Sequence, residues 1–140
     1  MKKFLIPYCL LCMLCGGINM AYAADEYNQN NGMIVRISEI EVYPEYFDEY
    51  LTFAKEVAEN SVAKEPGVIA IYPMMKIKNN EQIRILEIYQ DDNAYKKHIA
   101  SEHFKHYKTG TLNMVKYLDL VDMYQISPQA FVKVFKKAEE

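Results

Sequence analysis

All three histidines of this 140-residue chain lie in one short stretch: His98, His103 and His106. A histidine side chain can take or give a proton near neutral pH, and its ring nitrogens also bind metal ions. The ordinary alternative on an amphipathic helix is a half-buried histidine whose ring nitrogens are hydrogen-bonded to neighbouring groups. The stretch therefore offers acid–base catalysis, metal binding or packing.

The spacing of these residues argues against a metal site. On an ideal helix His98 and His103 are separated by about 500°, which places them about 140° apart around the axis. Ser101 lies between them and is expected to break the helix, and the chain contains no His-Glu-x-x-His sequence. Neither a metal ion nor another cofactor is predicted.

Other polar residues interrupt the strands that are expected to pack beside these histidines. Glu87 lies within the apolar run 83–89, where a carboxylate must be hydrogen-bonded, paired with a cation or protonated. Arg36 or Arg84 is the expected ion-pair partner, and Arg36 is also a candidate for binding an anionic or carbonyl group. Three tyrosine hydroxyls could hydrogen-bond a ligand: Tyr72, Tyr95 and Tyr107.

The hydrophobic periodicity predicts the elements that carry these residues. Apolar residues at spacings of three and four predict a helix that starts at Pro44 and ends at the turn Glu65-Pro66-Gly67. A second helix follows Asp91 or Asp92, and Ser101 is the expected cap of a further short helical turn. Residues 78–81 are expected to form a hairpin turn. Enrichment in β-branched and aromatic residues predicts four strands: 33–43, 68–77, 82–89 and 115–124.

The order of these elements predicts an α+β fold. Strand, helix, strand, strand, helix, strand is the ferredoxin-like split βαβ order, with one four-stranded antiparallel sheet. The domain is assigned to residues 33–124, and an extra C-terminal helix to residues 125–140. Residues of both parities in the strand 68–77 are apolar, so a second copy of the chain is expected to cover the sheet face that the helices leave open.

Three short motifs carry a family resemblance that spans about residues 33–122. Glu65-Pro66-Gly67 precedes the second strand, Glu87-Ile88-Tyr89 ends the third, and His98-Ile99-Ala100-Ser101-Glu102-His103-Phe104 follows on the helix. This pattern resembles the antibiotic biosynthesis monooxygenase (ABM) family of dimeric α+β barrels. The resemblance implies two sheets packed face to face, with a pocket in each subunit between sheet and helices and the helix histidine facing that pocket.

The resemblance also implies a function. It points to an oxidoreductase, a cofactor-independent monooxygenase of a small quinol, phenolic or enolisable carbonyl compound. His98 is then the expected general base, and the candidate substrate-binding residues are Arg36, Tyr72, Glu87, His103 and Tyr107. Two alternatives stay open: an isomerase of a small carbonyl compound on the same fold, and a non-catalytic dimeric module that binds a small molecule.

The first residues predict export. Met1-Lys2-Lys3 is a short basic region, residues 4–15 are an apolar run of 12, and Ala21-Tyr22-Ala23 is a small-x-small cleavage motif. Residues 1–23 are thus a predicted signal peptide and residues 24–32 a flexible leader, which places the mature protein in the periplasm or outside the cell. A membrane-spanning helix needs ~20 apolar residues, more than this run has. The alternative is a lipoprotein signal with Cys15 as the lipidated residue, although the preceding residue is Leu14 and not a small one.

Composition narrows the chemistry and the partners. All three cysteines lie in residues 1–23, so the mature chain has no disulfide, cysteine nucleophile or cysteine metal site. Cleavage also removes Lys2 and Lys3, which leaves 14 of the 16 basic residues against 19 acidic ones and a net charge near −5. An acidic chain without a basic cluster is unsuited to binding nucleic acid or an anionic membrane. The sequence has no phosphate-binding glycine loop, nucleophile elbow or dinucleotide fingerprint.

Overall fold

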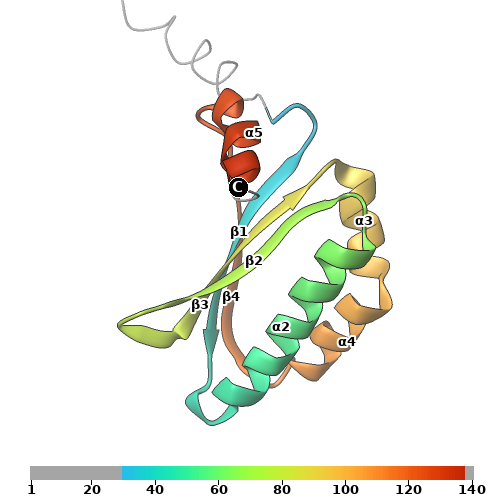
Figure 1. Cartoon of the computed structure of the whole chain (residues 1–140). Coiled ribbons are helices and arrows are strands. Elements are labelled where there is room, and N and C mark those ends of the chain that lie inside the picture. The colour runs from blue at the N-terminus through green and yellow to red at the C-terminus, as the bar shows by residue number, and fades with distance from the viewer. Residues whose placement is uncertain (1–29, 138–140) are drawn as a thin grey trace, which may run out of the picture.

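The computed structural model describes residues 30–137 (Figure 1). Its elements are β1 (Ile34–Val42), a short 3₁₀ turn η1 (Pro44–Tyr46), α2 (Phe47–Lys64), β2 (Val68–Lys76), β3 (Asn79–Tyr89), α3 (Asp92–Ala100), α4 (Glu102–Gly110), β4 (Val115–Asp122) and α5 (Pro128–Lys137). The strands form one sheet in the order β2-β3-β1-β4, and all neighbours are antiparallel. This is the predicted ferredoxin-like arrangement, so the fold prediction is confirmed.

Helices α2, α3 and α4 lie together on one face of the sheet (Figure 1). α2 packs on β2, α3 packs on β2 and β3, and α4 packs against α2. Apolar spacing in α2 places Tyr50, Ala54 and Ala58 toward the sheet, where all three are buried. They meet a buried core supplied by the facing strands: Ile40, Val42, Ile71, Ile83, Ile85 and Tyr89.

The strand register divides the sheet into two faces. Arg36 pairs with Glu87 and Ser38 pairs with Ile85, so these residues share the helix-facing side with the core strand residues. Tyr72 pairs with Leu86 and therefore lies on the opposite face. Exposed apolar residues on that opposite face include Tyr72, Met74 and Tyr117. The two-sided apolar character expected from the sequence is present, and the dimer that would cover the open face stays a prediction.

The β2–β3 hairpin is tighter than the sequence indicates. Lys76 pairs with Asn79, so the loop contains only Ile77 and Lys78, and β3 begins at Asn79 in place of residue 82. Asn79 and Asn80 are typical turn residues, but the strand register shifts between Met75, which pairs with Ile83, and Lys76, which pairs with Asn79. The ladder therefore continues through residues that were expected to form the turn.

Asn30 ties the start of the domain to the end of β4. Its side-chain amide donates to the carbonyl of Met123 at 2.9 Å, and its Oδ1 accepts from the backbone N–H of Gln125 at 3.0 Å. The backbone N–H of Met123 also donates to the carbonyl of Val35 at 2.8 Å. The two ends of the sheet domain are thus hydrogen-bonded to each other.

The predicted signal peptide, residues 1–23, lies outside the described residues, as does most of the predicted leader. Among the helices of residues 30–137, none is long and apolar enough to cross a membrane.

Candidate functional site

Ser101 separates α3, which carries His98, from α4, which carries His103. The Asp91 side chain caps α3 by accepting from the backbone N–H of Ala94 at 2.7 Å. At the other end of α3, the Ser101 hydroxyl donates to the carbonyl of His98 at 2.7 Å and accepts from the backbone N–H of Phe104 at 3.3 Å. One residue therefore ends α3 and starts α4, and the helix axis changes direction between His98 and His103.

Glu65 brings the two histidines together. It is the C-terminal cap residue of α2 and the first residue of the Glu65-Pro66-Gly67 turn. Its Oε1 lies 2.9 Å from His98 Nδ1 and 2.5 Å from His103 Nε2. His98 is 3% exposed, and the side chains of Glu65 and His103 are each 14% exposed. The expectation that this spacing keeps His98 and His103 apart is therefore wrong. The helix ends at Ser101, and the change of direction there turns the His103 side chain toward Glu65.

The shared carboxylate oxygen fixes the tautomers of both rings. An ionised carboxylate only accepts hydrogen bonds, so His98 Nδ1 and His103 Nε2 each carry a proton that points at Glu65. In neutral His98 the other nitrogen, Nε2, is then an unprotonated acceptor. This is the arrangement in which a carboxylate holds a histidine ready to take a proton.

Hydroxyl groups hold Glu87, and no lysine or arginine of residues 30–137 forms an ion pair with it. It accepts a short hydrogen bond from Ser38 Oγ and another from Tyr89 OH at 2.8 Å. The predicted ion pair with Arg36 or Arg84 is therefore wrong. Hydroxyl donors can satisfy a partly buried carboxylate without bringing a second charge out of water.

Each of the two arginines has another carboxylate partner. Arg36 donates through Nε to Asp122 Oδ1 at 2.7 Å, and Arg84 pairs with Glu39 at 3.2 Å. The guanidinium of Arg36 also lies 5.0 Å from the centre of the Tyr95 ring. The bond to Asp122 raises the pKa of Arg36 above its ordinary value, so this side chain is a permanent cation at the β1–β4 edge of the site.

Tyr107 and Tyr50 join their hydroxyl groups across α4 and α2. Their oxygens are 2.8 Å apart and their rings meet edge to face at 6.1 Å. Burial raises the pKa of both hydroxyls, and the negative charge of Glu87 adds to the effect. Both tyrosines are therefore neutral hydrogen-bonding groups at physiological pH.

A continuous array of aromatic rings connects two polar clusters: the histidine cluster of Glu65, His98 and His103, and the Glu87 cluster of Glu87, Ser38 and Tyr89. The Tyr89 ring lies 5.2 Å from that of Tyr95 and 5.3 Å from that of His98. The His98 ring lies 4.8 Å from that of Phe104, which is 6.3 Å from that of Tyr107. Because Tyr89 also donates to Glu87, the histidine cluster and the Glu87 cluster form one site on the helix-facing side of the sheet.

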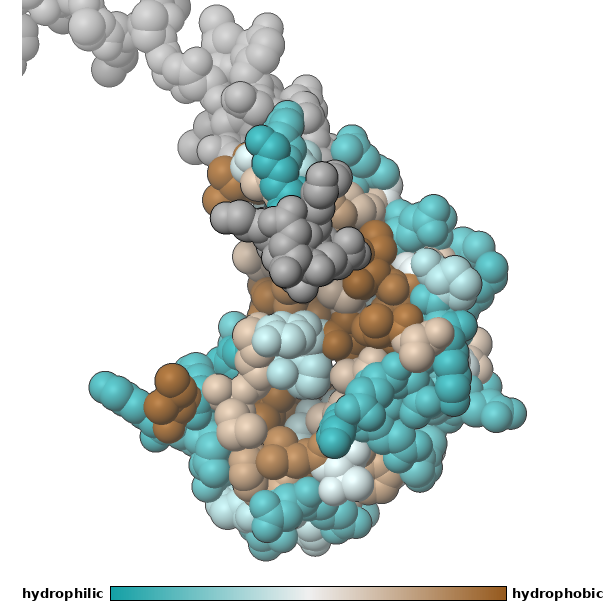
Figure 2. Space-filling view, viewed as in Figure 1, coloured by the Kyte–Doolittle hydropathy of each residue, from teal (hydrophilic) through white to brown (hydrophobic). Residues whose placement is uncertain are grey.

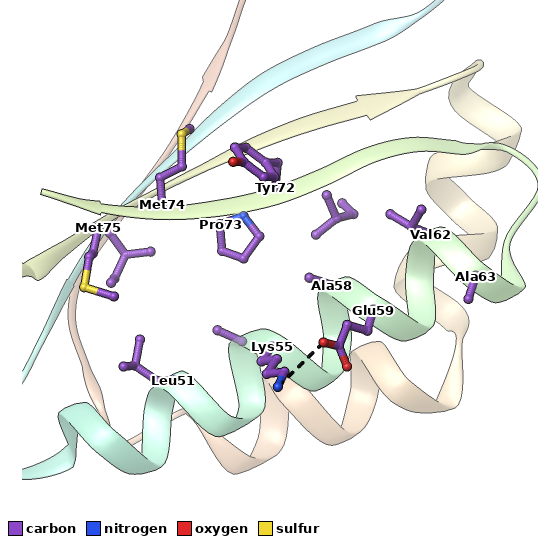
Figure 3. Close-up of a pocket in the computed structure, with 13 residues that line it drawn as sticks. Leu51, Lys55, Ala58, Glu59, Val62, Ala63, Tyr72, Pro73, Met74 and Met75 are labelled. Carbon is purple, nitrogen blue, oxygen red and sulfur yellow. Dashed lines mark ion pairs between the residues drawn. The ribbon is translucent and has the colours of Figure 1, made fainter. Parts of the chain in front are cut away.

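Two residues considered from the sequence lie apart from this site. Tyr72 is 62% exposed, and its pairing with Leu86 places it on the opposite face of the sheet from Glu87. It lines the larger groove between α2 and β2 (Figure 3), away from the other substrate-binding candidates. His106 is exposed, pairs with Glu56 at 3.4 Å and packs its ring 5.2 Å from that of Phe53.

Two cavities flank the sheet–helix interface. The smaller, about 250 Å³, lies between α4 and β4 and is lined in part by Tyr107, Ile40 and Leu118. The larger, about 690 Å³, is an apolar groove between α2 and β2 (Figure 3). On the face shown in Figure 2, brown and pale residues gather beside α2 and teal residues flank them. Glu65, His98 and His103 line neither cavity, and of the site residues described above only Tyr107 lines the smaller one.

Sequence reasoning missed Glu65 as a site residue. Glu65 was recognised only as part of a turn motif, and Ser38 was not considered. No signal in the sequence places Glu65 beside His98, because that contact depends on how the turn after α2 packs on α3. Among the described residues, Glu65, His98 and His103 form a group whose possible metal-ligand atoms all lie within 4.8 Å of one another.

The comparisons with known proteins agree with this fold. The family model described as antibiotic biosynthesis monooxygenase matches residues 33–110. A solved structure provisionally assigned to that family, from Bacteroides thetaiotaomicron, is 44% identical, with 70% of this chain and 93% of that chain covered and a TM-score of 0.69. No curated protein sequence matches the chain.

Two further solved structures share the fold. A provisionally assigned monooxygenase from Lactobacillus acidophilus is 26% identical, with a TM-score of 0.64, over 67% of this chain and 44% of that chain. This chain thus spans less than half the length of that protein. A second Bacteroides thetaiotaomicron protein, of unknown function and suggested to be an oxidoreductase, is 22% identical over 68% of this chain and 99% of that chain, with a TM-score of 0.62.

Proposed function

Because the chain belongs to the antibiotic biosynthesis monooxygenase family, we propose that it is an exported oxidoreductase that adds one oxygen atom from O₂ to a small quinol or phenol. His98 is its general base. The enzyme acts as a homodimer after removal of its signal peptide, and its substrate is a small aromatic molecule, not a nucleic acid or a membrane surface.

The observation that carries this proposal is the hydrogen bond between His98 Nδ1 and Glu65 Oε1 at 2.9 Å. It leaves Nε2 as the basic nitrogen of a ring that is held between aromatic neighbours. A neutral imidazole is suited to taking a proton from a substrate hydroxyl near pH 7. General-base catalysis of this kind contributes about 10²- to 10⁴-fold to the rate.

The surroundings of His98 suit an aromatic substrate. The rings of Tyr95, Phe104 and Tyr107 are half-buried, so each presents part of its surface to a ligand. Aromatic pairs stabilise one another by about 0.5–1.5 kcal/mol beyond the area that they bury. Arg36 supplies a fixed positive charge at the edge of the site and Tyr107 a neutral hydroxyl, and both groups favour an anionic oxygen.

The reaction uses the electrons of the substrate itself. Loss of a hydroxyl proton to His98 gives an electron-rich aromatic anion, which reacts with O₂ at a ring carbon. A quinol and O₂ then yield a hydroxyquinone and water: one oxygen atom forms the new carbon–oxygen bond and the other leaves as water. The quinol is oxidised by four electrons in total and O₂ is fully reduced, so the step is balanced without another reductant.

The test compares two histidines that the structure places differently. His98→Ala and His98→Gln should lower oxygen consumption with a panel of quinols by ~10²-fold or more. His106→Ala is the matched control, because His106 lies on the exposed surface and away from the aromatic array. The thermal midpoint of each variant is measured in parallel.

The two measurements together separate catalysis from packing. Since His98 is buried, His98→Ala leaves a cavity and is expected to lower stability by about 1–3 kcal/mol. His98→Gln retains an N–H donor for Glu65 and should fold normally. If His98→Gln keeps full turnover, or if activity falls only in proportion to unfolded protein, His98 is not the base. Quinol binding without oxygen consumption by the wild type would instead support a non-catalytic binding module.

A further inference from the structure

Glu65, His98 and His103 combine the ligand types and the proximity of a transition-metal site. We propose that these three side chains bind a Zn²⁺ ion, and that the bound ion switches off His98 as a base. The binding site itself follows from the geometry of the cluster. Its effect on turnover rests on the proposed function.

The donor set fits zinc. Two imidazoles and one carboxylate are a common three-ligand set for Zn²⁺, with a fourth position left for water. Tetrahedral coordination at about 2.0–2.2 Å separates neighbouring ligand atoms by roughly 3.4 Å. Oε1 of Glu65 now lies 2.9 Å from His98 Nδ1 and 2.5 Å from His103 Nε2, so an ion requires the carboxylate to retreat by about 1 Å. Imidazole ligands also disfavour Mg²⁺ and Ca²⁺, which take oxygen ligands.

The local charge leaves the carboxylate free for a cation. Among the described residues, the ion-pair partners of Glu65 are His98 and His103, and no lysine or arginine competes. Each histidine binds as a neutral imidazole through the nitrogen that now faces Glu65, with its ring proton on the other nitrogen, so the set carries one negative charge. His103 and Glu65 are each 14% exposed, which gives an ion a path from the surface to the buried nitrogen of His98.

The neighbouring groups already orient the ligands. The His98 ring is held between the rings of Tyr89 and Phe104. Ser101 Oγ lies 3.1 Å from His103 Nε2 and can hydrogen-bond a water molecule in the fourth position. Oriented ligands of this kind are a general requirement of metal sites in proteins.

Metal binding reverses the roles of the two nitrogens of His98. Without the ion, Nδ1 carries the proton and donates to Glu65, and Nε2 is the acceptor. A metal ion takes the lone pair of Nδ1, so the single ring proton of the neutral imidazole moves to Nε2. Nε2 then becomes a donor and can no longer take a proton from a substrate.

The experiment is a calorimetric titration of the untagged full chain with ZnCl₂, after alkylation of its three cysteines. We expect one ion per chain, and a Co²⁺-loaded sample should show the strong visible absorption of tetrahedral cobalt. His103→Gln should weaken Zn²⁺ binding by at least ~100-fold, because changes in the groups that merely orient ligands already weaken binding by about 10- to 100-fold. His106→Gln, another α4 histidine, should bind as the wild type does.

Circular dichroism and thermal melts establish that each variant is folded before titration. Equal Zn²⁺ affinity in the wild type and in folded His103→Gln would overturn the site, and so would the absence of binding in the wild type. Where turnover is measurable, stoichiometric Zn²⁺ should abolish it in the wild type and spare the residual turnover of His103→Gln. Zinc binding without turnover on any quinol would leave the metal site standing and refute the proposed function. Turnover that is insensitive to bound Zn²⁺ would overturn the switch.

Discussion

Gly67→Ala should destabilise the domain and loosen the candidate site, because this glycine lies against α3. A Cβ atom on Gly67 would lie 2.5 Å from Ala94 Cβ and 3.4 Å from Ala94 Cα. Carbon atoms pack at about 3.5–4.0 Å, so the turn and the helix must separate by roughly 1 Å. Neither Cβ atom can rotate away, and the carbonyl of Gly67 is anchored by the backbone N–H of Gln90 at 2.9 Å.

The expected loss is about 1–3 kcal/mol in the free energy of unfolding, the usual range for overpacking a core. Gly67 is not among the described residues with positive φ, so the loss comes from the contact and not from the backbone conformation. The separation also reaches the site, since Glu65 lies two residues before Gly67 and His98 lies one helical turn after Ala94. The hydrogen bond between Glu65 and His98, now 2.9 Å, should lengthen.

Urea unfolding of a double-mutant cycle measures the contact directly. Ala94→Gly alone should lower stability by about 1 kcal/mol through helix propensity. In Gly67→Ala/Ala94→Gly the clashing methyl pair is gone, so the loss should be smaller than the sum of the single losses by at least ~1 kcal/mol. Additive losses, within about 0.5 kcal/mol, would refute the argument that the two residues are in contact.

Three other predictions address pH, assembly and processing. Burial raises the pKa of Tyr50 and of Tyr89, so their contribution to stability is full below about pH 10 and is lost as the pH rises above that value. Urea midpoints that do not fall between about pH 9 and 11 would contradict this. The protein should be a dimer through the open sheet face in light scattering across a dilution series, and Leu86→Glu, on that face, should shift it to monomer; an unchanged dimer would place the interface elsewhere. The exported protein should begin at Ala24 by intact mass, and an acylated species that retains Cys15 would show lipidation instead.

The periodicity of the sequence was sufficient for the fold but not for the partners of its polar residues. The apolar face of α2 and the apolar residues of the strands can be buried together in only a few arrangements. The chain order of the elements then selects the ferredoxin-like fold. The partner of Arg36 depends on which strand lies on its other side. Glu87 is its neighbour on β3, but Asp122 on β4 is equally close in register and takes its Nε–H.

The sequence brought His98 and His103 forward as candidates within one stretch of chain, but it did not reveal the contacts between distant elements. His98 was identified from its helix face and its resemblance to a family motif. Glu65 could not be assigned, because its distance from His98 depends on how the turn after α2 packs on α3. Tyr72 was grouped with Glu87 from the sequence, but Tyr72 pairs with Leu86 and therefore lies on the other face of the sheet. The pattern of one strand alone does not reveal its register against the next strand.

The hydrogen bonds of Asn30 have a consequence for how this domain can be joined to others. Because they fasten Asn30 to Met123 and Gln125, the two ends of the sheet domain lie at the same corner of the sheet. A domain whose two ends lie close together tolerates circular permutation and insertion into another protein. It can be inserted into another protein through short linkers. A circular permutant can be made by opening the two-residue loop at Ile77 and Lys78.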